Sequence, residues 1–122
     1  MHHHVLLLED EPNIIEAIRF ILRRDGWQVS CHSDGATAVD TVTRLEPDVV
    51  VLDVMLPNRN GFDILRDLRA QKATAELPVL MLTAKGQAKD RERAEDLGVS
   101  AFMTKPFANA EVIDRLRSLV GA

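Results

Sequence analysis

The chain has 122 residues, 46% of them hydrophobic, and 15 Lys and Arg against 19 Asp and Glu leave a net charge of −4. These values predict a single compact domain over residues 1–122, and the acidic balance argues against direct nucleic-acid binding, which depends on Lys and Arg at phosphates. The longest apolar runs, of four residues, exclude a membrane span, which needs roughly 20. Because Cys31 is the one cysteine and no segment resembles a secretion signal, we expect a cytoplasmic location.

The first residues include three adjacent histidines: His2, His3 and His4. Such a run is either a metal-binding tail or the remnant of an expression tag. Adjacent histidines at a chain start rarely converge on one ion without a scaffold, so we assign them no function.

Short apolar runs rich in β-branched residues alternate with longer segments in which apolar residues recur every three or four positions. This alternation predicts a β-α unit repeated five times, hence an α/β fold with a parallel sheet. The expected strands cover residues 5–8, 28–31, 49–52, 79–82 and 101–103. The first, third and fourth of these are apolar throughout, which predicts that they are the central strands.

Five helices are expected between and after these strands. The first follows Pro12 and ends before Gly26, which suit a helix start and a helix end. The others are predicted at about residues 36–45, 62–71, 89–97 and 110–120. Their expected inward residues, with those of the first helix, are Ile14, Ile18, Ile21, Leu22, Val39, Val42, Leu65, Leu68, Val112, Ile113, Leu116 and Leu119.

The helix expected at 89–97 differs from the others because it is mostly charged. It offers only Ala94 and Leu97 to a core. A helix with few buried apolar contacts lies at the low-stability end of a structure, so we expect it to be weakly anchored. The alternative is an ordinary solvated helical face.

Polar side chains follow four of the five predicted strands. Glu9 and Asp10 follow the first, Asp53 the third and Thr83 the fourth, and Lys105 lies near the end of the fifth. In an open parallel sheet, ligands bind beyond the carboxyl ends of the strands. Three carboxylates there would repel one another unless a hard cation takes their oxygens, and Mg²⁺ completed by a phosphate fits best. Lys105 then adds a positive charge and Thr83 a hydroxyl donor.

Each of these residues also has an ordinary interpretation. Glu9 and Asp10 alone would indicate a helix start, and Asp53 a cap for the next loop. Thr83 is common in strands and Lys105 in any loop. Coincidence at four strand ends is much less probable than one shared site, which favours the functional interpretation.

The chain resembles the receiver domains of two-component response regulators, which include CheY-like proteins. The resemblance spans essentially the whole chain. The matching segments are Leu7-Leu8-Glu9-Asp10-Glu11-Pro12, residues 48–57 followed by Asn60-Gly61, Leu82-Thr83-Ala84 and Lys105-Pro106-Phe107.

The resemblance implies a doubly wound, flavodoxin-like sheet of five strands in the order 2-1-3-4-5. It implies that Asp53 accepts a phosphoryl group from the phosphohistidine of a sensor histidine kinase, with Lys105 and Thr83 assisting. Glu9, Asp10, Asp53 and the backbone carbonyl of Met55 would hold Mg²⁺. The domain would be a switch that catalyses only its own phosphorylation and dephosphorylation, and the Lys105-Pro106 bond would be cis.

The resemblance also implies how the switch works. A phosphoryl group adds roughly −1.5 to −2 charge and draws Thr83 inward, which makes room for Phe102 to turn in. The fourth helix, the fifth strand and the fifth helix would then differ between the two states.

Within the family, Thr83-Ala84-Lys85-Gly86 and the segments around Asp90 and Lys105 look like the OmpR/PhoB-type branch. That branch dimerises through the fourth helix, fifth strand and fifth helix, and the charges available here are Arg91, Asp96, Glu111, Arg115 and Arg117. Ser100 and Ala101 replace an acidic pair and Phe102 a more usual Tyr. The branch's DNA-binding domain is absent from this sequence, so we expect either a stand-alone receiver or one cut from a transcription factor.

Two other classes remain open at this point. One is a haloacid-dehalogenase-like phosphatase, whose nucleophile normally lies in an Asp-x-Asp signature after the first strand, where this chain has Glu9-Asp10-Glu11. The other is a pseudo-receiver that only binds partners, for which the complete acidic, Thr and Lys set provides no reason.

Overall fold

The computed structural model describes residues 3–84 and 88–121. His2 and the Lys85-Gly86 pair of the branch motif lie outside the described residues. Within these two ranges, no helix has the length and apolar character that a bilayer crossing requires.

One parallel sheet forms the centre of the molecule. Its strands are β1 (His4–Leu8), β2 (Gln28–His32), β3 (Val49–Asp53), β4 (Val79–Thr83) and β5 (Ala101–Thr104). They lie in the order β2-β1-β3-β4-β5, and every neighbouring pair is parallel. The predicted doubly wound α/β fold is confirmed, because this is the strand order of flavodoxin-like proteins.

Each strand is one residue longer than predicted. β1 begins one residue earlier, and the other four end one residue later. The parallel pairing continues through polar residues, so that Asp53 pairs with Leu82 and Thr83 with Thr104. Two predicted site residues are therefore the last residues of their strands rather than loop residues.

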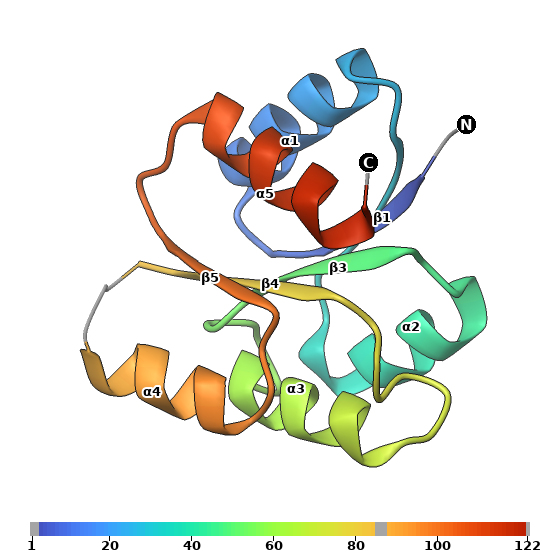
Figure 1. Ribbon diagram of the computed structural model, residues 1–122, viewed down its shortest axis with the longest axis vertical. Helices are drawn as coiled ribbons and strands as arrows, with labels where there is room; N and C mark the ends of the chain where they lie inside the picture. Colours follow the sequence, from blue (N-terminus) through green and yellow to red (C-terminus); the bar gives the residue numbers. More distant parts are fainter. Residues whose placement is uncertain (1–2, 85–87, 122) are drawn as a thin grey trace.

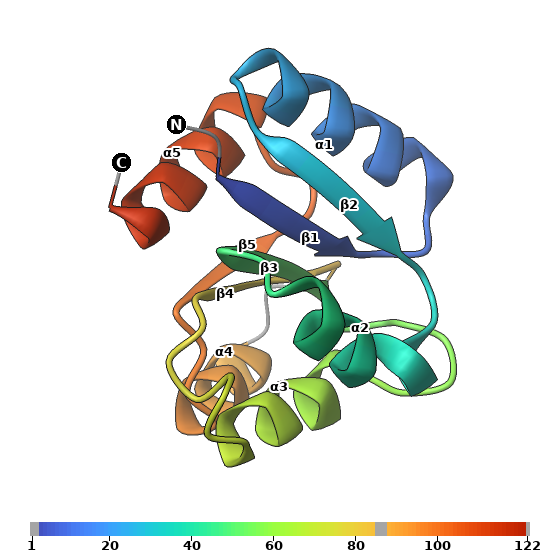
Figure 2. The same cartoon turned by 90° about the vertical axis from the view of Figure 1, so that its right-hand side faces the viewer.

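Helices cover both faces of the sheet (Figure 1). They are α1 (Pro12–Arg24), α2 (Ala38–Leu45), α3 (Gly61–Ala70), α4 (Ala88–Asp96) and α5 (Asn109–Val120). α1 and α5 lie on one face, and α2, α3 and α4 on the other, as both views show (Figure 2). Each layer of helices encloses its own apolar cluster against the sheet.

The core contains the residues expected from the sequence pattern. β1, β3 and β4 have fully buried apolar side chains, which confirms that they are the central strands. The predicted inward residues Ile18, Leu22, Val42, Leu65, Leu68, Val112 and Leu116 are buried, and Ile14, Ile21, Val39, Ile113 and Leu119 are partly buried against the same clusters.

The second helix begins differently from the prediction. A 3-10 turn, η1 (Gly35–Thr37), precedes α2, so the expected α-helical start at residue 36 is wrong by two residues. The Asp34 side chain accepts a hydrogen bond from the backbone N–H of Ala36 and so caps this tighter turn.

Candidate functional site

Four strand ends bring the predicted site residues to one edge of the sheet. Glu9 follows β1, Asp53 ends β3, Thr83 ends β4 and Lys105 follows β5. Glu9, Asp53 and Thr83 are 0%, 3% and 3% exposed. Buried polar groups require partners, so their placement together at this edge calls for compensating charges or hydrogen bonds.

Three carboxylates meet at this edge. Glu9, Asp10 and Asp53 each offer an oxygen atom, and these atoms all lie within 4.8 Å of one another. Glu9 Oε2 also accepts hydrogen bonds from the backbone N–H groups of Asp10 (3.1 Å) and Glu11 (3.2 Å). Asp10 is exposed, whereas the other two are buried, so the cluster opens to solvent on the Asp10 side.

Lys105 contacts two of the three carboxylates. Its Nζ atom lies 2.9 Å from Glu9 Oε1 and 3.3 Å from Asp53 Oδ1. Its backbone N–H donates to the carbonyl of Thr83 at 2.7 Å, which joins the segment after β5 to the end of β4. The Lys105-Pro106 bond is cis, as expected.

Burial and neighbouring charges shift the pKa values of Glu9 and Lys105. Burial raises the pKa of Glu9, and the nearby charge of Asp53 raises it further, although the Lys105 hydrogen bond opposes both. Burial opposes the charged form of Lys105, but its hydrogen bond to Glu9 and the charges of Asp53 and Glu9 keep its pKa above the usual value. Lys105 is therefore held in its charged form beside Glu9 and Asp53.

This donor set suits a hard cation. Mg²⁺ prefers carboxylate oxygens and retains several waters, and it is usually bound by a small number of carboxylates. Glu9 and Asp53 are buried, and exposed Asp10 leaves an approach from solvent. The cluster can therefore bind a metal ion.

The turn after β3 is close-packed against the strand end. The N–H of Gly61 donates to the carbonyl of Val54 at 2.8 Å. A Cβ atom at Gly61 would lie 2.6 Å from the Asp53 carbonyl oxygen, so only glycine fits there. The Met55 side chain is 71% exposed, and the role of its backbone carbonyl stays a prediction.

The two predicted switch residues lie close to the sheet. Phe102 pairs with Met81 across β4 and β5, and its ring is 7% exposed. The Arg91 guanidinium lies 5.5 Å from the centre of this ring. Phe102 is buried in this structure, and its role as a switch residue stays a prediction.

The residues predicted for a dimer surface also have contacts within the chain. Arg117 forms a two-bond ion pair with Asp25 at the end of α1, one of whose bonds, from Nε to Oδ2, is 3.1 Å long. Arg115 lies 3.9 Å from Glu111 on the same helix. Asp96 is exposed at the end of α4. Their role between two chains stays a prediction.

Ser100, which replaces an acidic residue of the branch, has a structural role here. Its Oγ accepts a hydrogen bond from the backbone N–H of Val79 at 2.9 Å, and its own N–H donates to the Val79 carbonyl. The hydroxyl thus satisfies a backbone N–H at the start of β4.

Sequence reasoning missed one group of contacts beside the site. Asp34 and Gly35, after β2, contact Pro57 and Asn58 in the turn after β3. Asp-Gly is a recognised turn signal, but it does not indicate which other loop the turn will contact.

The chain belongs to the response regulator receiver domain family, whose model matches residues 5–117. Domains of this family act in signalling by two-component systems, and the chain is such a receiver domain. This membership removes the basis for the phosphatase alternative.

Similar proteins come from several bacteria. The chain is 44% identical over 116 residues to the probable transcriptional regulatory protein TcrX of Mycobacterium tuberculosis, covering 95% of this chain and 49% of that protein. The chain thus spans about half the length of this relative. Among solved structures, a putative response regulator from Chloroflexus aurantiacus matches with a TM-score of 0.94 and 27% identity over the whole of both chains. The receiver domain of the sensor histidine kinase PA1611 from Pseudomonas aeruginosa, with magnesium in its active-site cleft, matches with a TM-score of 0.91 and 32% identity, also over both whole chains.

Proposed function

We propose that residues 1–122 act as one receiver domain that accepts a phosphoryl group on Asp53. The observation that carries this proposal is the cluster of Glu9, Asp10 and Asp53 oxygens within 4.8 Å of one another, with Lys105 Nζ bonded to two of them. A lone buried aspartate would have a structural explanation. Here three carboxylates at one sheet edge suit a cation, and the Lys105 ammonium beside two of them suits an anion such as a phosphoryl group.

The proposed donor is the phosphohistidine of a sensor histidine kinase. An Asp53 carboxylate oxygen attacks phosphorus, the new O–P bond forms, and the P–N bond breaks as the imidazole leaves with its electron pair. Lys105 neutralises charge on the phosphoryl oxygens, and the Thr83 hydroxyl donates to one of them. A carboxylate nucleophile carries no proton, so the step needs no separate base.

Glu9, Asp10, Asp53 and the backbone carbonyl of Met55 are the proposed Mg²⁺ ligands. When bound, the ion supplies positive charge that offsets the carboxylates and the transferring phosphoryl group. The same residues of the chain then do two things: Asp53 presents its oxygen to phosphorus, and Glu9 and Asp10 hold the cation beside it.

Mass spectrometry after incubation with acetyl phosphate and Mg²⁺ tests the assignment. We expect the intact chain to gain one phosphoryl group, through an acid-stable, base-labile bond, and Asp53→Asn to gain none while keeping its fold by circular dichroism. An unchanged mass of the unsubstituted chain would favour the pseudo-receiver alternative. Phosphorylation of Asp53→Asn would locate the acceptor elsewhere.

We further propose that phosphorylation changes the surface of α4, β5 and α5 through Thr83 and Phe102. Lys105→Ala should retain Mg²⁺ binding but lose the response of α4 to phosphorylation, because the lysine joins the site to the segment after β5. NMR shifts of α4 amides with beryllofluoride, a phosphoryl mimic, measure this response. An unaltered response in Lys105→Ala would remove the lysine from the pathway.

The partners follow from the same proposal. A second copy would dock through α4, β5 and α5, using Arg91, Asp96, Glu111 and Arg115, with Arg117 also engaged within the chain. Light scattering with beryllofluoride should show a larger dimer fraction, and a chain that stays monomeric at high concentration would remove the dimer.

The probable transcriptional regulatory protein TcrX is about twice as long as this chain. A DNA-binding output segment beside this domain is therefore part of the proposal, with the cytoplasm as its place of action.

A further inference from the structure

Residues 32–35, the end of β2 and the segment that follows it, contact both halves of the acidic site, although they supply no ligand themselves. The N–H of Glu9 donates to the carbonyl of His32 at 3.2 Å, at the half of the site that follows β1. The N–H of Gly35 donates to the carbonyl of Pro57 at 2.9 Å, in the turn that follows Asp53. Residues 32–35 thus connect the two strand ends that bring the carboxylates together (Figure 2).

A side-chain hydrogen bond reinforces the second connection. Asn58 Nδ2 donates to Asp34 Oδ1 at 2.9 Å, and the same oxygen accepts the backbone N–H of Ala36. Asn58 adopts the left-handed conformation, with φ of 71°, which asparagine tolerates better than most residues. The hydrogen bond from Asn58 lowers the pKa of Asp34, so the acceptor is a carboxylate at neutral pH.

The two loops touch through their backbones as well. A Cβ atom at Gly35 would lie 2.3 Å from the carbonyl oxygen of Arg59 and 2.7 Å from that of Pro57. Only glycine allows this approach. This close approach limits motion of the turn after β3 toward residues 34 and 35, and the hydrogen bonds to Pro57 and from Asn58 oppose motion away from them.

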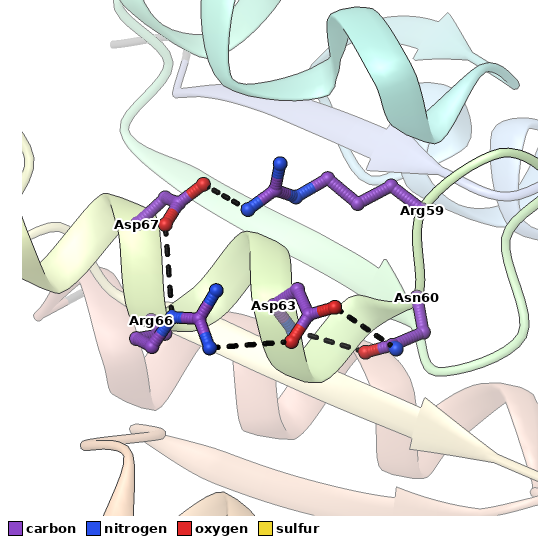
Figure 3. A network of polar contacts seen from close by, with 5 residues as sticks. All are labelled: Arg59, Asn60, Asp63, Arg66 and Asp67. Carbon is purple, nitrogen blue, oxygen red and sulfur yellow. Dashed lines mark hydrogen bonds and ion pairs between the residues drawn. The ribbon is translucent and has the colours of Figure 1, made fainter.

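The other end of the same turn is attached to α3. Arg59 pairs with Asp67, and Arg66 lies between Asp67 and Asp63 (Figure 3). The Asn60 side chain accepts the backbone N–H of Asp63 at 3.0 Å and caps the helix. Residues 54–60 are thus held by α3 on one side and by Asp34 and Gly35 on the other.

We propose that Asp34 and Asn58 are positioning residues of the cation site. Their hydrogen bond holds residues 54–60, which follow Asp53 and contain Met55, at the distance from Glu9 and Asp10 that cation binding requires. This inference rests on the proposed function. Neither side chain touches the cation, and both act through the backbone of the turn.

Two single substitutions break the bond, and each keeps the local backbone role of the residue that it replaces. Asn58→Gly removes the amide donor but keeps a residue suited to the left-handed conformation, and the net charge stays the same. Asp34→Ser keeps a side-chain oxygen that can cap Ala36 but is too short to reach Asn58. The double substitution Asp34→Asn with Asn58→Asp exchanges the donor and the acceptor, which restores the bond at unchanged net charge.

Calorimetric titration with Mg²⁺ alone measures the effect. We expect each single substitution to weaken Mg²⁺ binding by about 10-fold, as for other residues that orient metal ligands from outside the ligand shell. The exchanged pair should recover most of the affinity. Arg66→Ala is the matched control, because it removes the ion pairs of Arg66 with Asp63 and Asp67 (Figure 3) but not the Asp34–Asn58 bond.

Thermal unfolding separates positioning from simple stabilisation. Single substitutions that lower the melting temperature but leave Mg²⁺ affinity at the level of the unsubstituted chain would overturn the inference while leaving the proposed function intact. A folded exchanged pair that fails to recover affinity would also overturn it. An unsubstituted chain that binds no Mg²⁺ would overturn the proposed function and this inference together.

Discussion

The helices α4 and α5 flank β5 in the sequence but are held to the sheet in different ways. α5 buries Val112 and Leu116 completely and packs three further apolar residues against the same cluster. α4 consists mostly of charged residues, and Ala94 is its one buried residue. Weak anchoring of α4 stays a prediction, which this difference in burial supports, because burial of large apolar side chains is the main source of packing energy.

Arginine side chains supply much of what holds α4. The guanidinium of Arg93 lies 4.4 Å from the centre of the Phe62 ring on α3, and that of Arg91 lies 5.5 Å from the Phe102 ring on β5. Arg69 Nε donates to the carbonyl of Gly98, just after α4, at 2.8 Å. Contacts of this kind are worth roughly 0.5–1 kcal/mol each at exposed sites. We therefore expect that α4 can shift without exposing a large core surface, whereas α5 cannot.

Truncating a buried side chain in α5 should produce the largest difference between the two helices. Leu116→Ala should lower the free energy of unfolding by about 2–5 kcal/mol, because it leaves a cavity between α5 and the sheet. The α4 counterpart, Ala94→Gly, should cost only about 1 kcal/mol, mainly through helix propensity. Urea unfolding followed by circular dichroism measures both values. Equal losses would show that α4 contributes as much packing as α5.

The arginine contacts of α4 provide the next test. Arg93→Ala should cost about 0.5–1 kcal/mol through the lost stacking on Phe62. Its clearest effect should be faster hydrogen exchange of α4 amides at nearly unchanged exchange in α5, because local opening of α4 does not require global unfolding.

Glu92→Ala is the matched control for this substitution, since it is an exposed residue of the same helix with a charge of the opposite sign. Faster exchange of α5 amides in Arg93→Ala, to the same degree as in α4, would contradict the idea that α4 opens by itself.

The contrast between these helices is visible in the sequence, but the contacts that produce it are not. The apolar spacing of α5 and the charged composition of α4 predicted both buried faces correctly. The stacking of Arg93 on Phe62 joins residues that lie 31 positions apart in the sequence. An arginine on a charged helix has many possible partners, so its composition alone does not select one.

The site shows the same division. Its charged residues were predictable because each comes at the end of a buried strand, and parallel strands bring these ends to one edge. The ends of β3, β4 and β5 were placed one residue early, because polarity marks where the core ends and not where the backbone pairing ends. The Asp34–Asn58 bond joins two polar loops 24 residues apart, and no local pattern predicts such a contact.

The smallest expected effect concerns the ion pair between α5 and α1. Asp25 accepts from both Arg117 and Trp27 Nε1, at 3.1 Å for the tryptophan. The Arg117 side chain is 50% exposed and that of Asp25 16%, so Arg117→Gln should cost only about 0–1 kcal/mol. Salt should reduce the difference between the two proteins, because screening weakens exposed pairs.

Trp27 is the chain's one tryptophan, so its fluorescence reports directly on this contact. Arg117→Gln should shift the emission of Trp27 through the altered surroundings of Asp25, with little change in the unfolding midpoint. A loss of stability as large as that of Leu116→Ala would mean that the ion pair, rather than apolar packing, attaches α5 to the molecule. α4 and α5 would then both depend on arginine contacts, and the proposed freedom of α4 would lose its physical basis.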